Sequence, residues 1–228
     1  MTAILDTQTY LRPDGWLDAG DAELTGRDAE VRDKLIDAVR FLHKRGVLQN
    51  PGSANASVLL PDSPGRVLLS AKGLPADITP ARFGVVTRDG EFVGGRLGPG
   101  VQKVIKMHTL AYDRAGVTSV IHSHSHHATA FALAHQPIPP NYEALVNRGQ
   151  AVEIPCAPYR KRNNGDLGDS VRALLAQHPD TRAVLLANHG VLVFDSGPTQ
   201  TANLLATIEE AATLEIYAAS LGGSKAIG

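Results

Sequence analysis

Apolar positions along the chain recur with two spacings, and these spacings predict its helices and strands. From Arg27 to Gly46 they recur every three to four residues, which predicts an amphipathic helix that ends at the glycine. Elsewhere, short runs of aliphatic and β-branched residues lie between Pro and Gly turns, which is typical of strands. Helices are predicted over 27–46, 101–114, 128–135, 166–177 and 198–221, and strands over 56–60, 66–70, 83–87, 91–93, 117–122, 151–154, 183–187 and 191–194.

The order of these elements indicates a layered fold in one domain. Several strands follow one another too closely for a regular strand–helix–strand series, so a mixed α/β or α+β sheet is favoured over a doubly wound one. No repeat, low-complexity tract or linker-like change of composition divides the chain. We therefore expect an irregular N-terminal segment over residues 1–26 and a single domain over residues 27–228.

Composition excludes several functional classes. With 22 Lys and Arg against 23 Asp and Glu, the charge balance favours neither nucleic acid nor a membrane surface as a partner. No apolar run approaches the roughly 20 residues that a membrane helix needs. The N-terminus lacks the basic start and apolar core of a secretory signal, and the single cysteine, Cys156, cannot form an internal disulfide. These features fit a cytoplasmic protein.

The segment VIHSHSHHATAFALAH, residues 120–135, holds five of the nine histidines of the chain. Residues i and i+2 of a strand share a face, so His122 and His124 are expected to project together. Two neutral imidazoles that share a divalent cation avoid the repulsion between protonated rings, and zinc binds such nitrogens at roughly 2.0–2.1 Å. Taken alone, a His-x-His pair is equally compatible with polar residues on an exposed strand end.

His189 is the best candidate for a third metal ligand. It follows the apolar run AVLLAN and precedes Gly190, a residue that lets the backbone approach another element closely. Catalytic metal sites typically use three protein ligands and leave one position for water or substrate. His126 and His127 begin the next predicted helix. We expect one of them to lie next to a metal-binding histidine, on the side away from the ion, and to help fix its orientation.

Four motifs in a fixed order make the chain resemble the class II aldolase/adducin family. They are the Asn-x-Ser pair at 55–57, SAKG at 70–73, HSH at 122–124 and NHG at 188–190. The resemblance extends over about residues 27–221 and implies a three-layer α/β/α fold around a largely antiparallel nine-stranded sheet. It also implies a homotetramer with active sites at subunit interfaces. The family's metal-binding histidines fall on His122, His124 and His189.

The resemblance implies one divalent metal ion per subunit, with zinc preferred and manganese, iron or cobalt as alternatives. Such an ion acts as a Lewis acid on a carbonyl oxygen and stabilises the enediolate that forms when a C–C bond breaks. We therefore expect a lyase that cleaves or decarboxylates a small hydroxy- or oxo-carbonyl compound, including carboxylates and sugar phosphates. The alternatives are an iron-dependent oxygenase, an isomerase on the same scaffold, and a non-catalytic adducin-like interaction module.

The residue expected to transfer protons differs in type from the one that the family has at this position. The family places an acid, usually Glu, where this chain has Gln102 or Lys103. A lysine transfers protons near neutral pH only if desolvation lowers its pKa, and its structural alternative is a solvated helix face. Tyr142 and Glu143 lie where aldolases of the family contribute a tyrosine from a neighbouring subunit. The catalytic candidates are therefore Lys103, Tyr142 and Glu143, the last of which could instead cap or salt-bridge a short helix.

Two polar turns are expected to line the substrate pocket. By the resemblance, Asn55 and Ser57 face the ligand, and the turn from Ser70 to Gly73 presents hydroxyl and backbone N–H groups to it. The Ser-Ser pair with which sugar-phosphate aldolases hold phosphate is absent, because Pro-Gly-Val stands in its place. Lys72 supplies a cation instead, which could hold a carboxylate or a phosphate, although it could also be an exposed turn residue.

Overall fold

The computed structural model describes residues 4–52, 54–160 and 166–227, apart from the side chains at positions 102, 103 and 166. A nine-stranded sheet with the order β1-β5-β4-β3-β2-β6-β9-β8-β7 forms its centre. Neighbouring strands are antiparallel except for β7 and β8, which run parallel. The strands are β1 (Leu17–Asp18), β2 (Asn55–Leu59), β3 (Arg66–Ser70), β4 (Phe83–Thr87), β5 (Phe92–Leu97), β6 (Ser119–Ser123), β7 (Cys156–Ala157), β8 (Ala183–Leu186) and β9 (Gly190–Asp195).

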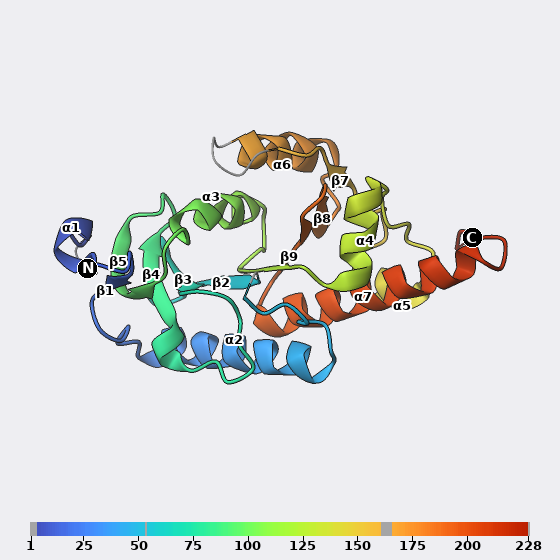
Figure 1. Ribbon diagram of the computed structural model, residues 1–228. Coiled ribbons are helices and arrows are strands. Elements are labelled where there is room, and N and C mark those ends of the chain that lie inside the picture. The colour runs from blue at the N-terminus through green and yellow to red at the C-terminus, as the bar shows by residue number, and fades with distance from the viewer. Residues whose placement is uncertain (1–3, 53, 161–165, 228) are drawn as a thin grey trace.

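Helices cover both faces of the sheet and make three layers (Figure 1). One face packs against α2 (Gly26–Lys44), α4 (His126–Ala134) and α7 (Pro198–Ala219), and the other against α3 (Gln102–Ala111) and α6 (Asp166–Gln177). The remaining helices are α1 (Thr7–Tyr10), the 3₁₀ helix η1 (Pro80–Arg82) and α5 (Glu143–Asn147). This arrangement confirms the expected three-layer α/β/α fold with a mostly antiparallel sheet.

Alternation along the central strands sends successive side chains to opposite layers. On β6, Ile121 joins the core under α2 and α7, whereas Val120 joins the core under α3 and α6. His122 shares the face of Val120 because the two residues are two positions apart. On the neighbouring strand β2, Asn55 pairs with His122 and Ser57 pairs with Val120. The α3 side of the sheet centre therefore carries polar side chains in an otherwise apolar layer.

The predicted strand over 151–154 is wrong. Only Ile154 pairs there, in an isolated bridge with Ile138, and the strand of this region is β7. The physical reason lies in the neighbouring residues. Pro155 has no N–H to extend a ladder, and the side-chain amide of Gln150 donates to the Val152 carbonyl at 2.8 Å. The carbonyl groups of Val152 and Glu153 are therefore bonded by a side chain instead of a neighbouring strand.

The N-terminal segment predicted to be irregular contains α1 and β1, and β1 pairs with β5 at the sheet edge. Its other described residues lack regular structure until α2 begins at Gly26. The division of the chain at residues 26 and 27 stays a prediction. Within the described residues, no helix combines the length and the apolar character needed to cross a bilayer.

Candidate active site

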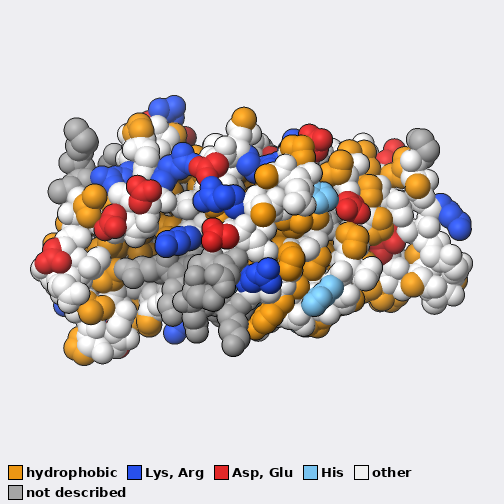
Figure 2. All heavy atoms as spheres, turned by 90° about the horizontal axis from the view of Figure 1, so that it is seen from above, with side chains coloured by type: hydrophobic (Ala, Val, Ile, Leu, Met, Phe, Trp, Pro, Cys, Tyr) orange, Lys and Arg blue, Asp and Glu red, His pale blue; other side chains and the backbone are white. Residues whose placement is uncertain are grey.

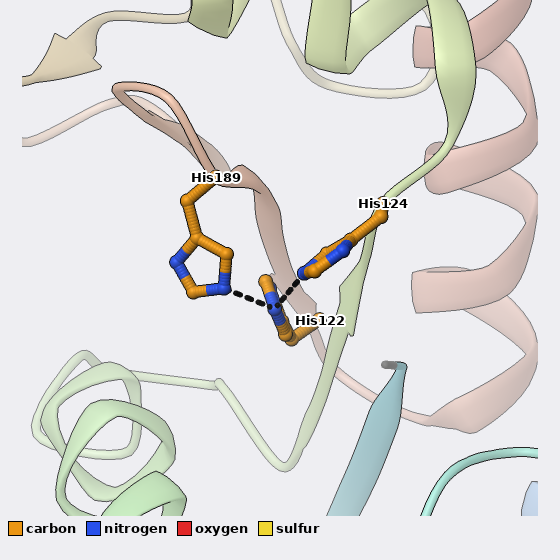
Figure 3. Close-up of side chains that lie close together, drawn as sticks. All are labelled: His122, His124 and His189. Atoms are coloured by element: carbon orange, nitrogen blue, oxygen red, sulfur yellow. Dashed lines mark hydrogen bonds between the residues drawn. The ribbon is translucent and has the colours of Figure 1, made fainter. Parts of the chain in front are cut away.

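Three imidazoles from two separate parts of the chain converge at the ends of β6 and β9 (Figure 3). The Nε2 atom of His122 lies 3.1 Å from Nε2 of His124 and 3.1 Å from Nε2 of His189. Nitrogens that share a tetrahedral zinc ion at its usual bond length stand about 3.3 Å apart. The three ligand atoms all lie within 4.8 Å of one another, so the donors and their spacing fit one divalent ion.

The surroundings of His122 keep its ring neutral and oriented. Its Nδ1–H donates to the carbonyl oxygen of Val191 at 3.0 Å, which leaves the Nε2 lone pair facing the other two rings. Burial, followed by the charges of His189 and His124, holds the pKa of His122 well below its usual value. A neutral imidazole with a fixed lone pair is the form that binds a metal ion.

The turn between β8 and β9 places His189 by backbone geometry. Asn188 adopts a left-handed conformation with φ of 58°, and its N–H donates to the Ala132 carbonyl at 3.1 Å. Its side-chain oxygen accepts a 2.6 Å hydrogen bond from His135 at the end of α4. A Cβ at Gly190 would lie 2.4 Å from the Ser123 carbonyl oxygen, so only glycine lets β9 approach β6 this closely.

Glu209 of α7 binds the start of α4, the segment that follows His124 in the chain. Its buried carboxylate accepts the backbone N–H groups of His127 at 2.9 Å and Ala128 at 3.0 Å, at the N-terminus of α4. It also bonds the His127 ring at 2.8 Å. A carboxylate at this position satisfies unpaired helix donors and interacts favourably with the helix dipole. His127 is therefore held by α7, and it helps to fix the start of α4 directly after His124.

A cleft of about 960 Å³ opens beside the histidines and is lined by His122 and His189. Its other walls come from α3, the start of β2, the turn after β3 and the first turns of α6. Among the described residues, four basic side chains line it, namely Lys72, Arg88, Lys106 and Arg172. Figure 2 looks onto this face and shows basic and acidic side chains gathered over one half, with apolar side chains more frequent over the other.

Of the basic cleft residues that the structure describes, two share one carboxylate and two have no ion-pair partner. Arg88 donates to Asp113 at 2.7 Å, and Arg172 lies 3.6 Å from the same carboxylate. Lys72 and Lys106 form no ion pair with any residue the structure describes. An unpaired lysine in a cleft attracts an anionic group.

The predicted substrate-binding residues fall into two groups. Asn55, Lys72 and Gly73 line the cleft. Gly73 has φ of 63°, and a Cβ there would lie 2.6 Å from the Pro51 carbonyl oxygen, so the turn itself requires glycine. Ser57 and Ser70 are fully buried and do not line the cleft. The Ser70 hydroxyl accepts the Ala56 N–H at 3.1 Å and so ties β3 to β2.

Within one chain, Tyr142 and Glu143 do not lie at the histidines. Tyr142 and Glu143 begin α5, which packs against α7, and neither lines the cleft. Asn141 donates to Ser224 at 2.8 Å, which places this segment near the C-terminal end (Figure 1). The side chains of Gln102 and Lys103 lie outside the described part of the structure. The cleft residue that follows them on α3 is Val104, which has no proton to transfer.

His108 is a residue of this region that the sequence motifs did not reveal. It lies on α3, is fully buried, and hydrogen-bonds to Asn55 at 2.5 Å and to Ser57 at 2.7 Å. Ser57 in turn lies 2.5 Å from the Tyr112 hydroxyl. One signal was present, because His108 and Tyr112 are polar members of the apolar stripe that contains Val101 and Ile105.

Burial of His108 predicts loss of stability in acid. Desolvation lowers its pKa to about 3, so between that value and about 6.5 the unfolded chain binds a proton that the folded chain does not. The stability contributed by the neutral ring is therefore present at neutral pH and is lost as the pH falls. From pH 7.5 to pH 5.5 we expect a loss of about 1.4 kcal/mol from this residue.

Urea unfolding of metal-free protein at the two pH values checks this expectation. His108→Gln is the matched variant, because it removes the titrating ring and leaves the other histidines in place. The pH-dependent loss should be smaller in the variant by the amount given above. An equal loss in both proteins would contradict the assignment.

Comparisons with known proteins identify the family. A model of the class II aldolase and adducin N-terminal domain matches residues 33–216, so the chain belongs to this family. A 3-oxo-tetronate 4-phosphate decarboxylase from Escherichia coli is 31% identical over 195 residues, which cover 82% of this chain and 86% of the relative. An L-fuculose phosphate aldolase from the same species is 27% identical over 166 residues, 72% of each protein.

The fold is also shared with a solved structure. An L-fuculose 1-phosphate aldolase matches with a TM-score of 0.76 and 22% identity, over 91% of this chain and 92% of that one. At this identity the likeness shows the fold. The two relatives named above catalyse different reactions, an aldol cleavage and a decarboxylation, and both reactions break a C–C bond.

Proposed function

We propose that this protein is a divalent-metal-dependent lyase that cleaves a C–C bond in a small hydroxy- or oxo-carbonyl compound. The observation that carries the proposal is the convergence of three imidazoles: Nε2 of His122 lies 3.1 Å from Nε2 of His124 and from Nε2 of His189, and His122 and His189 line a cleft large enough for a small metabolite. The named relatives support it, because an aldolase and a decarboxylase both act next to a carbonyl group.

His122, His124 and His189 would hold the ion, with zinc preferred and manganese, iron or cobalt as alternatives. When bound, the ion would supply Lewis-acid chemistry to a substrate oxygen. The chain contributes the neutral, oriented ring of His122 and a cleft that shields part of the site from water, where such electrostatic stabilisation is stronger than in bulk water.

The substrate we propose carries an anionic group. Lys72 and Lys106 are cleft cations without a described ion-pair partner, and Asn55 lies beside the histidines on the same wall. A carboxylate or a phosphate would satisfy these groups. The two named relatives act on phosphorylated compounds, which supports a sugar phosphate or a phosphorylated oxo acid.

We propose that proton transfer requires a second copy of the chain. In a homotetramer with active sites at subunit interfaces, Tyr142 or Glu143 of the partner subunit would complete the cleft. Two observations support this arrangement: both residues lie away from their own cleft, and large apolar side chains are exposed on the same end of α7, including Leu214 and Tyr217. Lys103 stays a candidate for proton transfer from within the same chain.

We also propose a cytoplasmic location, which fits the single cysteine.

Metal analysis combined with a substrate panel tests the proposal. The purified protein is expected to hold one divalent ion per chain by mass spectrometry, and to cleave L-fuculose 1-phosphate or decarboxylate 3-oxo-tetronate 4-phosphate, or both. Chelation should abolish the activity, and the ion found in the protein should restore it.

The outcomes separate the alternatives. Protein without stoichiometric metal, whose activity is insensitive to chelation, would overturn the proposal. Oxygen consumption with iron, and none with zinc or manganese, would instead indicate an oxygenase.

A further inference from the structure

We propose that His108 is a positioning residue that fixes the orientation of the Asn55 side chain, so that the amide NH₂ group faces the cleft beside the metal-binding histidines. The cleft would then present a fixed hydrogen-bond donor at that point. It would select a substrate whose oxygen accepts a hydrogen bond there, such as a carboxylate, phosphate or carbonyl oxygen. The choice of substrate in this inference rests on the proposed function. The orientation of the Asn55 amide rests on the hydrogen-bond network alone.

The network lies under the cleft, and Asn55 is its one described member that lines the cleft. Asn55 pairs with His122 across β2 and β6, so its side chain stands beside the first metal-binding histidine on the α3 face of the sheet. Asn55 lines the cleft, whereas His108, Ser57 and Tyr112 are buried behind it. A change in the buried groups therefore reaches the cleft through the amide.

Each buried group in the network has one consistent role. His108 is neutral, because burial lowers its pKa to about 3, and it therefore carries a single ring proton. Its Nε2 faces the Asn55 oxygen, which can only accept, so the proton is on Nε2. Its Nδ1 then accepts from the Ser57 hydroxyl, which in turn accepts from the Tyr112 hydroxyl. The chain of donors runs from Tyr112 through Ser57 and His108 to Asn55.

The reverse direction leaves a buried proton without an acceptor. If the Asn55 amide were turned around, Nε2 would accept, Nδ1 would donate to Ser57, and Ser57 would donate to the Tyr112 oxygen. The Tyr112 proton would then need another acceptor, and among the described residues Ser57 is its hydrogen-bond partner. Burial also raises the pKa of Tyr112, so its proton stays on the oxygen. The buried hydroxyls of Ser57 and Tyr112 thus determine the direction of the network, because in the reverse direction the last hydroxyl keeps a proton without an acceptor, and neither residue lines the cleft.

The direction of these hydrogen bonds determines which end of the Asn55 amide faces the cleft. The Oδ1 atom of Asn55 is occupied by His108, and the described residues offer its Nδ2 group no hydrogen-bond partner. A donor without a partner in a partly buried cleft favours a ligand that supplies an acceptor. A ligand with only a donor at this point would leave two donors facing each other.

The tautomer of His108 is tested first, on the full-length protein without substrate. A long-range ¹H–¹⁵N spectrum of histidine-labelled protein at pH 7.5 distinguishes a proton on Nε2 from one on Nδ1, and His108→Gln assigns the signal. We expect the Nε2–H form. An Nδ1–H form would overturn the inference whether or not the protein proves to be a lyase.

Kinetics of His108→Gln test the consequence in the cleft. A glutamine amide can donate to or accept from the Asn55 side chain, so this variant leaves Asn55 free to turn, and we expect KM to rise about tenfold while kcat changes less than about threefold and the metal content stays the same. Asn55→Asp, which removes the donor itself, should raise KM about a hundredfold. Tyr112→Phe is the matched control, with unchanged KM, because Ser57 can still donate to Nδ1 of His108 and the direction of the network is kept. An unchanged KM in His108→Gln would overturn the inference.

Discussion

Replacement of His189 by alanine is expected to remove the bound metal and to lower kcat/KM by about 1,000-fold. The loss follows because a metal ion that polarises a substrate oxygen supplies several kcal/mol of transition-state stabilisation, and each 1.4 kcal/mol is a factor of ten in rate. Two histidines would remain at the site, one fewer than a catalytic zinc site normally uses. Metal content by mass spectrometry and steady-state kinetics of the same preparation measure the two effects together.

The variant is also expected to fold normally. His189 is partly exposed at the tip of the turn between β8 and β9, so its removal leaves no buried cavity. The free energy of unfolding of the metal-free protein should therefore change by less than about 1 kcal/mol. Without metal the wild-type protein should lose the same activity, which separates loss of the ion from damage to the fold.

His126→Ala provides the matched control for this experiment. His126 is two residues from His124, begins α4 and is exposed. We expect wild-type metal content and activity from this variant. If His189→Ala kept both its metal and its activity, the three-histidine site would not be the catalytic centre.

The local patterns of the sequence predicted most elements because those elements are amphipathic. The hairpin of β2 and β3 and the long helix α7 each carry a clear period and clear turn residues, and they form close to where they were expected. The prediction of a strand over 151–154 failed because Pro155 has no N–H for a ladder and the Gln150 side chain bonds the carbonyl groups of this segment. Neither effect is visible in hydrophobic periodicity.

The metal-binding candidates could be predicted because their geometry is partly local. His122 and His124 are two residues apart: His122 lies in β6, and His124 directly follows its last residue, Ser123. The approach of His189 depends on pairing between β6 and β9, which are about seventy residues apart in the chain, so the sequence offered only the motif and the resemblance. His108 was missed for a related reason. Its partners Asn55 and Ser57 lie on a strand more than fifty residues away, and only packing of α3 on the sheet brings them together.

Replacement of Gly190 by alanine is expected to damage both the fold and the site, although it adds a single methyl group. The new Cβ would lie 2.4 Å from the Ser123 carbonyl oxygen and 2.9 Å from Cδ2 of His124. The first neighbour is backbone in the centre of the sheet and cannot rotate away, so β9 must move from β6. We expect a loss of about 3 kcal/mol in the free energy of unfolding, which is the upper part of the range for overpacked cores.

The same displacement should weaken metal binding by about 100-fold. His189 immediately precedes Gly190 on the displaced strand, and His124 is in direct contact with the added carbon, so two of the three ligands would shift relative to His122. Urea unfolding of the metal-free protein and competition with a chelator of known affinity measure the two effects separately. A large loss of affinity with unchanged stability would mean that the ligands move without the strand.

Gly94→Ala is the matched control, because Gly94 also lies in a strand but has no atom within 4 Å of an added Cβ. Its backbone conformation is one that alanine adopts without strain, so the variant should be neutral or more stable by a few tenths of a kcal/mol. If Gly190→Ala behaved like this control, the contact between β9 and β6 would not be what holds His189 against the other two rings. The placement of that ligand would then depend on the left-handed turn at Asn188 and its hydrogen bond to His135.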